Sequence, residues 1–262
     1  MSADPALLDR IAADLAGAAR DRQPIAQISA AHPDLTPADA YAIQQRLVAG
    51  YLADGARIVG WKIGLTSLAM QRQLGVDQPD YGPILDRWLV ASGGTVAAAD
   101  FIAPRVEAEI AFILAEPLRG PGVSVEDVRR ATRVVAPAIE VIDSRIADWK
   151  LTLVDTVADL ASSARVVLGD ARIPLDGLDL RLVGVVLEQD GDVAATGAGA
   201  ACLGDPLAAV AWAANTLGSL GVTLEAGHVI MPGALHASVQ AHAGAGFRAR
   251  FDRLGDVAVD FG

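Results

Sequence analysis

Two glutamates lie two positions apart in an apolar stretch, RVEAEI (105–110), and a third lies in another, APAIEVID (136–143). Side chains alternate between the two faces of a β-strand, so Glu107 and Glu109 would point the same way, about 7 Å apart at the backbone. Two ionised carboxylates at that separation repel each other in a partly buried site. A bound cation is the simplest remedy, and Glu140 in the second strand supplies a third carboxylate.

The types of ligand indicate the kind of cation. The glutamates come without cysteine or histidine at ligand spacing, which favours a hard ion in an all-oxygen shell, Mg²⁺ or Mn²⁺ before Zn²⁺. The alternative is that the glutamates face solvent or pair with Arg105, Arg145 or Arg165. The position of Glu140 in an apolar strand weighs against that alternative.

Composition limits the classes of function. A chain of 262 residues with 52% hydrophobic residues can bury the core of one large domain or two small ones. With 32 acidic against 21 basic residues, nucleic-acid binding is disfavoured. The single cysteine, Cys202, excludes an intrachain disulfide. The N-terminus lacks a signal-peptide pattern and the most apolar helix candidate, 206–217, is too short to span a membrane, so we expect a cytoplasmic protein without membrane contact.

The elements that must position the glutamates divide into a helical front and a strand-rich body. Asp4-Pro5 and Thr36-Pro37 predict the starts of amphipathic helices, and 66–75 predicts a short one. Apolar, β-branched runs predict strands at 58–64, 106–114, 136–143, 165–169, 180–188, 228–233, 246–251 and 256–262.

The strands do not alternate regularly with helices, which favours a mixed, rolled or sandwich-like sheet over a doubly wound parallel one. The predicted class is therefore α+β. We expect a helical N-terminal region over 1–75 and a mixed-sheet catalytic body over 76–262, together forming one functional unit.

Seven segments, in this order over most of the chain, carry a resemblance to a known family. The segments are GWKIGLTS (60–67), GVDQPDYGPILD (75–86), RVEAEIAFIL (105–114), PAIEVIDSRIADWK (137–150), DTVADLASSARVVLG (155–169), GDPLAAVAWAANTL (204–217) and GHVIMPGALHASV (227–239). Together they resemble the hydratase and decarboxylase branch of the fumarylacetoacetate hydrolase superfamily. The resemblance implies that family's mixed β-sheet roll or sandwich.

The resemblance also implies catalytic roles. Glu107, Glu109 and Glu140 would be the divalent-metal ligands, in agreement with the electrostatic argument above. Lys62 of GWKIG would be the active-site lysine, and Asp80 of QPDYG the acid/base aspartate. Without the resemblance, Lys62 would be interpreted as an exposed side chain and Asp80 as a turn residue.

Substrate contacts are implied in DLASS and GALHASV. Ser162 would help to hold the substrate carboxylate, and His236 is a second-rank candidate, although a lone histidine is more often structural. The family commonly has asparagine where this chain has Leu160. An isobutyl group loses the hydrogen bond of an amide, so either another residue supplies that contact or the substrate preference has shifted.

The implied activity is that of a hydro-lyase, a Mg²⁺- or Mn²⁺-dependent hydratase of 2-hydroxypenta-2,4-dienoate (2-oxopent-4-enoate) or a close homologue. It would act in meta-cleavage degradation of aromatic or steroid compounds. One alternative is decarboxylation of 4-oxalocrotonate (2-oxohex-3-enedioate), which requires a pocket for a distal carboxylate. Another is a non-catalytic subunit that binds a 2-oxo acid or a partner enzyme. A homo-oligomer is implied, and a downstream aldolase is a candidate partner.

Overall fold

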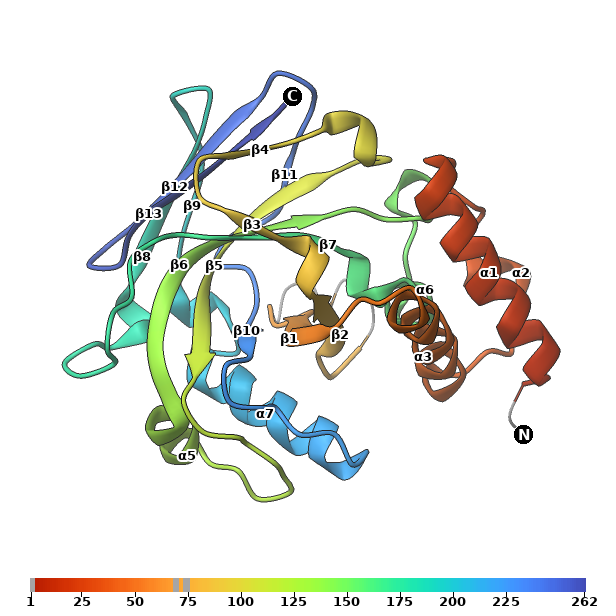
Figure 1. Cartoon of the computed structure of the whole chain (residues 1–262), viewed down its shortest axis with the longest axis horizontal. Coiled ribbons are helices and arrows are strands. Elements are labelled where there is room, and N and C mark those ends of the chain that lie inside the picture. Colours follow the sequence, from red (N-terminus) through yellow and green to blue (C-terminus); the bar gives the residue numbers. More distant parts are fainter. Residues whose placement is uncertain (1–2, 68–70, 73–75) are drawn as a thin grey trace.

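Two β-sheets form the body of the chain, and helices from its N-terminal part pack on one side of the larger sheet (Figure 1). The computed structural model describes residues 3–67, 71–72 and 76–262. The short helix predicted over 66–75 lies largely outside these ranges, although Gln71 and Arg72 are helical.

The larger sheet contains both parallel and antiparallel neighbours. β1 and β10 run parallel, as do β3 and β7, whereas β5 pairs antiparallel with β6 and β10. Its strands in spatial order are β2 (Asp80–Leu85), β1 (Ile58–Gly64), β10 (Val229–Met231), β5 (Arg105–Leu114), β6 (Thr132–Ile142), β7 (Ser163–Leu168) and β3 (Leu89–Ala91), and β11 (Val239–Gln240) pairs with β5. This arrangement confirms the predicted mixed sheet and the α+β class.

The smaller sheet closes the other side of the core. Its strands in spatial order are β4 (Gly94–Val96), β13 (Gly255–Phe261), β12 (Gly246–Phe251), β8 (Gly184–Gln189) and β9 (Asp192–Ala198). The helices are α1 (Pro5–Asp21), α2 (Ile28–Ala31), α3 (Pro37–Ala53), α5 (Val125–Ala131), α6 (Leu153–Ala158) and α7 (Pro206–Ser219).

The predicted starts of the first amphipathic helices are confirmed. The Asp4 side chain caps α1 by accepting from the Ala6 N–H, and Thr36 forms a capping box with Asp39 at the start of α3. α1 and α3 pack against each other and bury their apolar faces, so they extend the core beyond the large sheet.

β5 and β6 lie at the centre of the large sheet. Ala108, Ile110 and Phe112 of β5 are fully buried in the main core, on the face that looks toward the smaller sheet. By strand alternation, the glutamates of β5 must project from the opposite face, where only a small apolar cluster that includes Ala111 and Met231 is found among the described residues.

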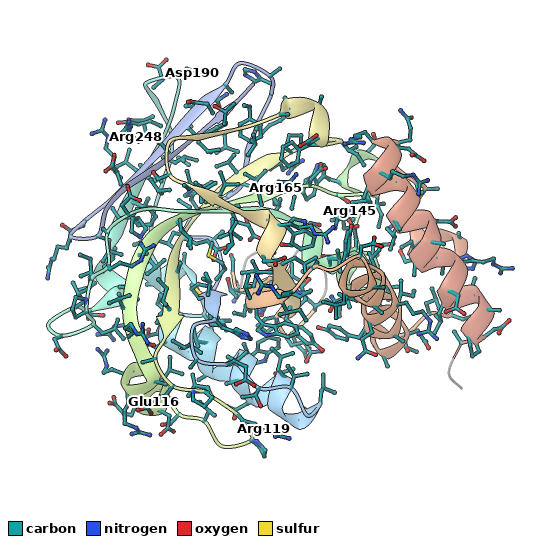
Figure 2. The ribbon with its side chains drawn as sticks, viewed as in Figure 1. Glu116, Arg119, Arg145, Arg165, Asp190 and Arg248 are labelled. Carbon is teal, nitrogen blue, oxygen red and sulfur yellow. The ribbon has the colours of Figure 1, made fainter. Side chains whose placement is uncertain are left out.

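The predicted boundary at residue 75 remains a prediction. β1 precedes it but pairs with β2 and β10 of the large sheet. In Figure 2, Arg145 and Arg165 lie between the sheet and α1, whereas Asp190 and Arg248 lie far out on the smaller sheet.

Among the described residues, no helix is both long and apolar enough to cross a bilayer.

Candidate active site

The register of β5 and β6 brings the three predicted glutamates together. Glu107 lies directly opposite Glu140 across the two strands, and Glu109 follows on the same face of β5. One carboxylate oxygen from each residue can be chosen so that all three lie within 4.8 Å of one another. Like charges placed directly opposite each other destabilise a sheet, so this face needs a compensating cation.

Glu140 shows most clearly that a cation fits. The residue is fully buried, and neither carboxylate oxygen accepts a hydrogen bond from the described part of the chain. Lys62 Nζ lies 3.4 Å from Glu140 Oε2, which is an ion-pair contact rather than a well-formed hydrogen bond. Buried carboxylate oxygens without partners are costly, and an all-oxygen set of this kind suits Mg²⁺ or Mn²⁺.

Burial makes all three carboxyl groups hold protons more tightly. Burial and the charge of Glu140 raise the pKa of Glu107 to about 7. Burial and the charges of Glu140 and Glu107 raise the pKa of Glu109 well above its usual range. Burial also raises the pKa of Glu140, against the opposing effect of Lys62. A divalent cation would favour the ionised forms and reverse these shifts.

Lys62 and Asp80 come from the adjacent antiparallel strands β1 and β2. Lys62 is only 4% exposed and Asp80 only 1%, so neither is a surface residue. The Lys62 ammonium donates to the Ala161 carbonyl over 2.8 Å, and Thr156 Oγ1 donates to Asp80 Oδ2 over 3.1 Å. A Cβ at Gly64 would lie 2.1 Å from Asp80 Oδ1, so this approach of the carboxylate requires glycine.

The pKa values of Lys62 and Asp80 both lie above their ordinary values. Burial lowers the pKa of Lys62, but the charges of Glu140 and Asp80 outweigh it, and the pKa lies above its ordinary value. Burial raises the pKa of Asp80, against the opposing charge of Lys62. Lys62 therefore stays protonated at neutral pH, while Asp80 holds its proton to a higher pH than a surface aspartate does.

A left-handed segment before β7 forms one wall of the site. Leu160, Ala161 and Ser162 have φ values of 59°, 51° and 58°, a backbone conformation that residues other than glycine rarely adopt. The Ser162 hydroxyl is buried, lines the cavity described below and has no hydrogen-bond partner among the described residues. A Cβ at Gly82 of β2 would lie 2.4 Å from the Leu160 carbonyl oxygen, so β2 packs tightly against the turn.

The structure places the Leu160 side chain away from the site. It is 1% exposed, packs in the helix-side core with Leu85 and Trp88, and is absent from the cavity lining. Leu160 as a substrate-binding residue stays a prediction, and in this structure the left-handed turn directs its side chain toward the helices. The isobutyl group fills core volume where an amide would need partners.

His236 anchors the opposite wall. Its Nε2 accepts from the Ala108 N–H over 3.1 Å, and Nδ1 lies 2.8 Å from the Ala237 carbonyl oxygen. The proton is therefore assigned to Nδ1 of a neutral imidazole, and burial lowers the pKa of His236. The ring lines the cavity while both nitrogens hold the backbone in place.

These walls enclose a cavity of about 680 Å³, the catalytic cavity. The predicted residues among its lining are Lys62, Asp80, Glu107, Ser162 and His236. Arg105 also lines the cavity, which was not predicted, although it stands two positions before Glu107 on the same strand face. The Arg105 guanidinium stacks 4.5 Å from the centre of the Trp149 ring and has no hydrogen bond or ion pair within the described ranges.

Gly233 positions Glu109. Its N–H donates to Glu109 Oε2 over 2.8 Å, its φ is +127°, and a Cβ there would lie 1.9 Å from Thr66 Oγ1. We expect Gly233→Ala to weaken Mg²⁺ binding about 10- to 100-fold, the usual effect of losing a group that orients a ligand. Gly227→Ala is the matched control, because it also has positive φ (+85°) but open space around its Cβ. Calorimetric titration with Mg²⁺ checks this, and equal affinities of the two variants would contradict the role of Gly233.

Known proteins match nearly the whole chain in sequence and in structure. No protein-family model matches the chain. Over 257 residues the chain is 43% identical to a 2-keto-4-pentenoate hydratase from Paraburkholderia xenovorans (strain LB400), covering 98% of this chain and 96% of the relative. A 4-oxalocrotonate decarboxylase from Pseudomonas putida G7, complexed with magnesium and adipate, superposes with a TM-score of 0.96 at 39% identity over 99% of both chains.

A more distant structure shows the fold. The fumarylacetoacetate hydrolase from psychrophilic Exiguobacterium antarcticum has a TM-score of 0.63 at 16% identity, over 78% of this chain and 74% of that one. This likeness confirms the predicted type of mixed-sheet fold.

Proposed function

Since the chain belongs to the family of 2-keto-4-pentenoate hydratases and 4-oxalocrotonate decarboxylases, we propose that it is a metal-dependent hydro-lyase of unsaturated 2-oxo acids. Its substrate would be 2-hydroxypenta-2,4-dienoate (2-oxopent-4-enoate) or a close homologue, and its product a 4-hydroxy-2-oxo acid. The observation that carries this proposal is the buried cluster of Glu107, Glu109 and Glu140 beside Lys62 and Asp80.

The three glutamates would hold Mg²⁺ or Mn²⁺ at the floor of the catalytic cavity. When bound, the ion supplies Lewis acidity that stabilises negative charge on the 2-oxo group of the substrate. The buried Ser162 hydroxyl at the cavity wall has no hydrogen-bond partner among the described residues, which suits it to bind a substrate carboxylate. His236 would shape the wall rather than transfer protons, because both of its nitrogens contact backbone groups.

Lys62 and Asp80 would handle the proton transfers. Burial raises the pKa of Asp80, which favours proton exchange closer to neutral pH than for a surface carboxyl group. The ammonium of Lys62, fixed by Ala161 and close to Glu140, would orient water or stabilise charge that develops on the substrate. Replacement of either residue should therefore affect turnover more than metal binding.

Product analysis tests the proposed activity. Freshly generated 2-hydroxypenta-2,4-dienoate would be added to the protein with Mg²⁺ or with a chelator. We expect 4-hydroxy-2-oxopentanoate only when the metal is present. No product under either condition would reject the hydratase for this substrate.

The position of Arg105 on the cavity wall favours a second candidate activity, decarboxylation of 2-oxohex-3-enedioate. The Arg105 guanidinium lies on the catalytic cavity wall and makes no hydrogen bond or ion pair with the described residues, so it can bind the distal carboxylate that this substrate carries. If decarboxylation is the activity, Arg105→Met should raise KM for this dicarboxylate about tenfold or more, because a charged hydrogen bond is lost. The control is Arg119→Met at an exposed position (Figure 2). A normal KM in the Arg105 variant would remove this support for decarboxylation.

Metal affinity should increase with pH. Burial and Glu140 hold the pKa of Glu107 at about 7, so below that pH a proton competes with the ion for the carboxylate. If Mg²⁺ binding displaces one proton, the Mg²⁺ dissociation constant should fall about tenfold for each unit that the pH rises toward 7. Above pH 7 the dissociation constant should change less with pH. Titration calorimetry from about pH 6 to about pH 8, in buffers of different ionisation enthalpy, counts the protons released. A dissociation constant that does not change with pH would contradict this linkage.

The remaining family-based expectations stay predictions. They are a homo-oligomer, contact with a downstream aldolase, a cytoplasmic location and a role in meta-cleavage degradation. A non-catalytic subunit would bind a 2-oxo acid such as oxalate tightly without turning over any dienoate, and the product analysis above separates that case from the enzyme.

A further inference from the structure

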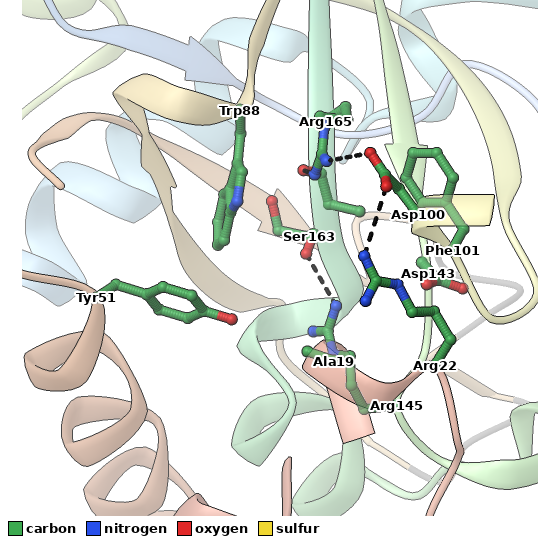
Figure 3. A pocket seen from close by; sticks show the side chains of 11 residues that line it. Ala19, Arg22, Tyr51, Trp88, Asp100, Phe101, Asp143, Arg145, Ser163 and Arg165 are labelled. Atoms are coloured by element: carbon green, nitrogen blue, oxygen red, sulfur yellow. Dashed lines mark hydrogen bonds and ion pairs between the residues drawn. The ribbon is translucent and has the colours of Figure 1, made fainter. Parts of the chain in front are cut away.

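A second cavity lies on the helix side of the larger sheet and shares no lining residue with the catalytic cavity. It encloses about 200 Å³ between the end of α1, α3 and the start of β7 (Figure 3). We call it the arginine pocket. Its principal lining residues are Arg22, Tyr51, Trp88, Arg145, Ser163 and Arg165.

Hydrogen-bond donors surround this space. The Ser163 hydroxyl is buried and has no partner among the described residues, and Ser163 itself is 1% exposed. Figure 3 shows the Tyr51 hydroxyl directed from α3 toward the same space. No hydrogen bond of the Tyr51 hydroxyl or the Trp88 indole N–H is found in the described part of the chain. The pocket therefore presents several donors whose hydrogen bonds are not made within the described residues.

The guanidinium groups of Arg22, Arg145 and Arg165 differ in how firmly their contacts fix them. Arg145 is fixed, because it pairs with buried Asp159 and donates to the Ser163 carbonyl over 3.1 Å. Arg22 and Arg165 share one carboxylate, that of Asp100, and each reaches it only at 3.5 Å. Arg22 also donates to the Arg20 carbonyl, and Arg165 to the Ala164 carbonyl over 2.9 Å. Since a guanidinium carries five N–H donors, each of these two keeps donors without a partner among the described residues.

The acidic residues of the pocket do not satisfy these donors. Asp143 already accepts from the N–H groups of Ile102 and Ala103, at 2.9 and 2.7 Å. Asp100 is 44% exposed and can turn toward solvent. Three arginines and two aspartates line the pocket, and Arg145 has its own counter-ion in Asp159, so Arg22 and Arg165 are the cations that face the shared Asp100.

We propose that the arginine pocket binds a small tetrahedral oxyanion of the phosphate type. Donors converge from α1, α3, β7 and the segment after β6, so the ligand must offer acceptor oxygens in several directions. A tetrahedral oxyanion does so, whereas a planar carboxylate offers two oxygens in one plane. The anion takes the place of Asp100 between Arg22 and Arg165 and accepts from the Ser163 hydroxyl.

The bound anion would stabilise the wall of the catalytic cavity from the side that faces the arginine pocket. Ser162 lines that cavity and Ser163 lines the arginine pocket, and Arg145 bonds to both Asp159 and Ser163. The ligand therefore stabilises the segment 159–163, whose Ala161 carbonyl holds Lys62.

Titration with inorganic phosphate tests the proposal. Thermal unfolding and calorimetric titration are followed at constant ionic strength, with sodium chloride as the reference salt and acetate as the planar anion. We expect a saturable phosphate response, in Mg²⁺ and equally in chelator, that chloride and acetate do not reproduce. Arg22→Gln and Ser163→Ala should each weaken it, the former about tenfold or more.

The matched control is Arg20→Gln. It removes the same charge from the same helix end, but Arg20 pairs with Asp21, its side chain is 71% exposed, and it is not part of the pocket lining. This variant should bind phosphate as the unmodified chain does. The proposal is overturned if phosphate acts no differently from chloride, if it binds only with Mg²⁺ present, or if Arg22→Gln and Ser163→Ala both bind as tightly as Arg20→Gln.

Discussion

The Glu107→Gln variant is expected to lose turnover and Mg²⁺ affinity together, with kcat/KM lower by about a thousandfold or more. Glu107 lies opposite Glu140 and supplies one of three oxygens that come within 4.8 Å of one another. Glutamine keeps the shape but removes the charge that an all-oxygen site needs. Charge stabilisation by a metal contributes several kcal/mol to a transition state, and about 4 kcal/mol corresponds to a thousandfold in rate.

Two measurements check this, steady-state kinetics with the dienoate and calorimetric titration with Mg²⁺. Glu116→Gln serves as the control because Glu116 is exposed and far from the site (Figure 2). Both parameters should be unchanged in the control. Full Mg²⁺-dependent turnover in Glu107→Gln would show that Glu107 is not a ligand.

Lys62→Met should separate turnover from metal binding. Loss of a positioned proton donor or acceptor lowers kcat about 100- to 10,000-fold. The Lys62 ammonium lies 3.4 Å from Glu140 Oε2, so its removal also removes a positive charge that repels the incoming ion. Mg²⁺ affinity should therefore stay the same or increase while kcat falls, a combination that a folding defect would not produce.

The chain's other lysine provides the comparison. Lys150 is 69% exposed and pairs with Asp148 over 3.2 Å, so Lys150→Met should keep both kcat and Mg²⁺ affinity. A parallel loss of metal and turnover in Lys62→Met would assign Lys62 to holding the carboxylate cluster. Unchanged turnover would remove it from the catalytic residues.

Strand alternation accounts for what was predictable about the site. It places Glu107 and Glu109 on one face of β5, and the apolar context of Glu140 indicates a buried partner. What alternation does not provide is the pairing of β5 with β6, which depends on contacts between segments distant in sequence. The helix starts at Asp4 and Thr36 were predictable because capping depends only on residues that are close together in the sequence.

Local patterns failed where the backbone leaves ordinary conformations. The run 180–188 was predicted as one strand, yet Leu180–Leu182 form a 3-10 turn and β8 begins at Gly184. The three left-handed residues 160–162 could not be foreseen, because none of them is glycine. This turn sets the direction of the Leu160 side chain, which packs with Leu85 and Trp88, and that packing could not be predicted from the sequence.

The left-handed segment also constrains how the chain can change in evolution. Connecting segments usually tolerate insertions and deletions. Here Ser162 and Ser163 line different cavities, while Asp159 pairs with Arg145 and Ala161 holds Lys62. One added or lost residue between Asp159 and Ser163 would break this spacing on both sides of the wall at once. Length variation should therefore be as rare in this loop as in a central strand, and transfer of this site to another scaffold would require the whole segment with both of its faces.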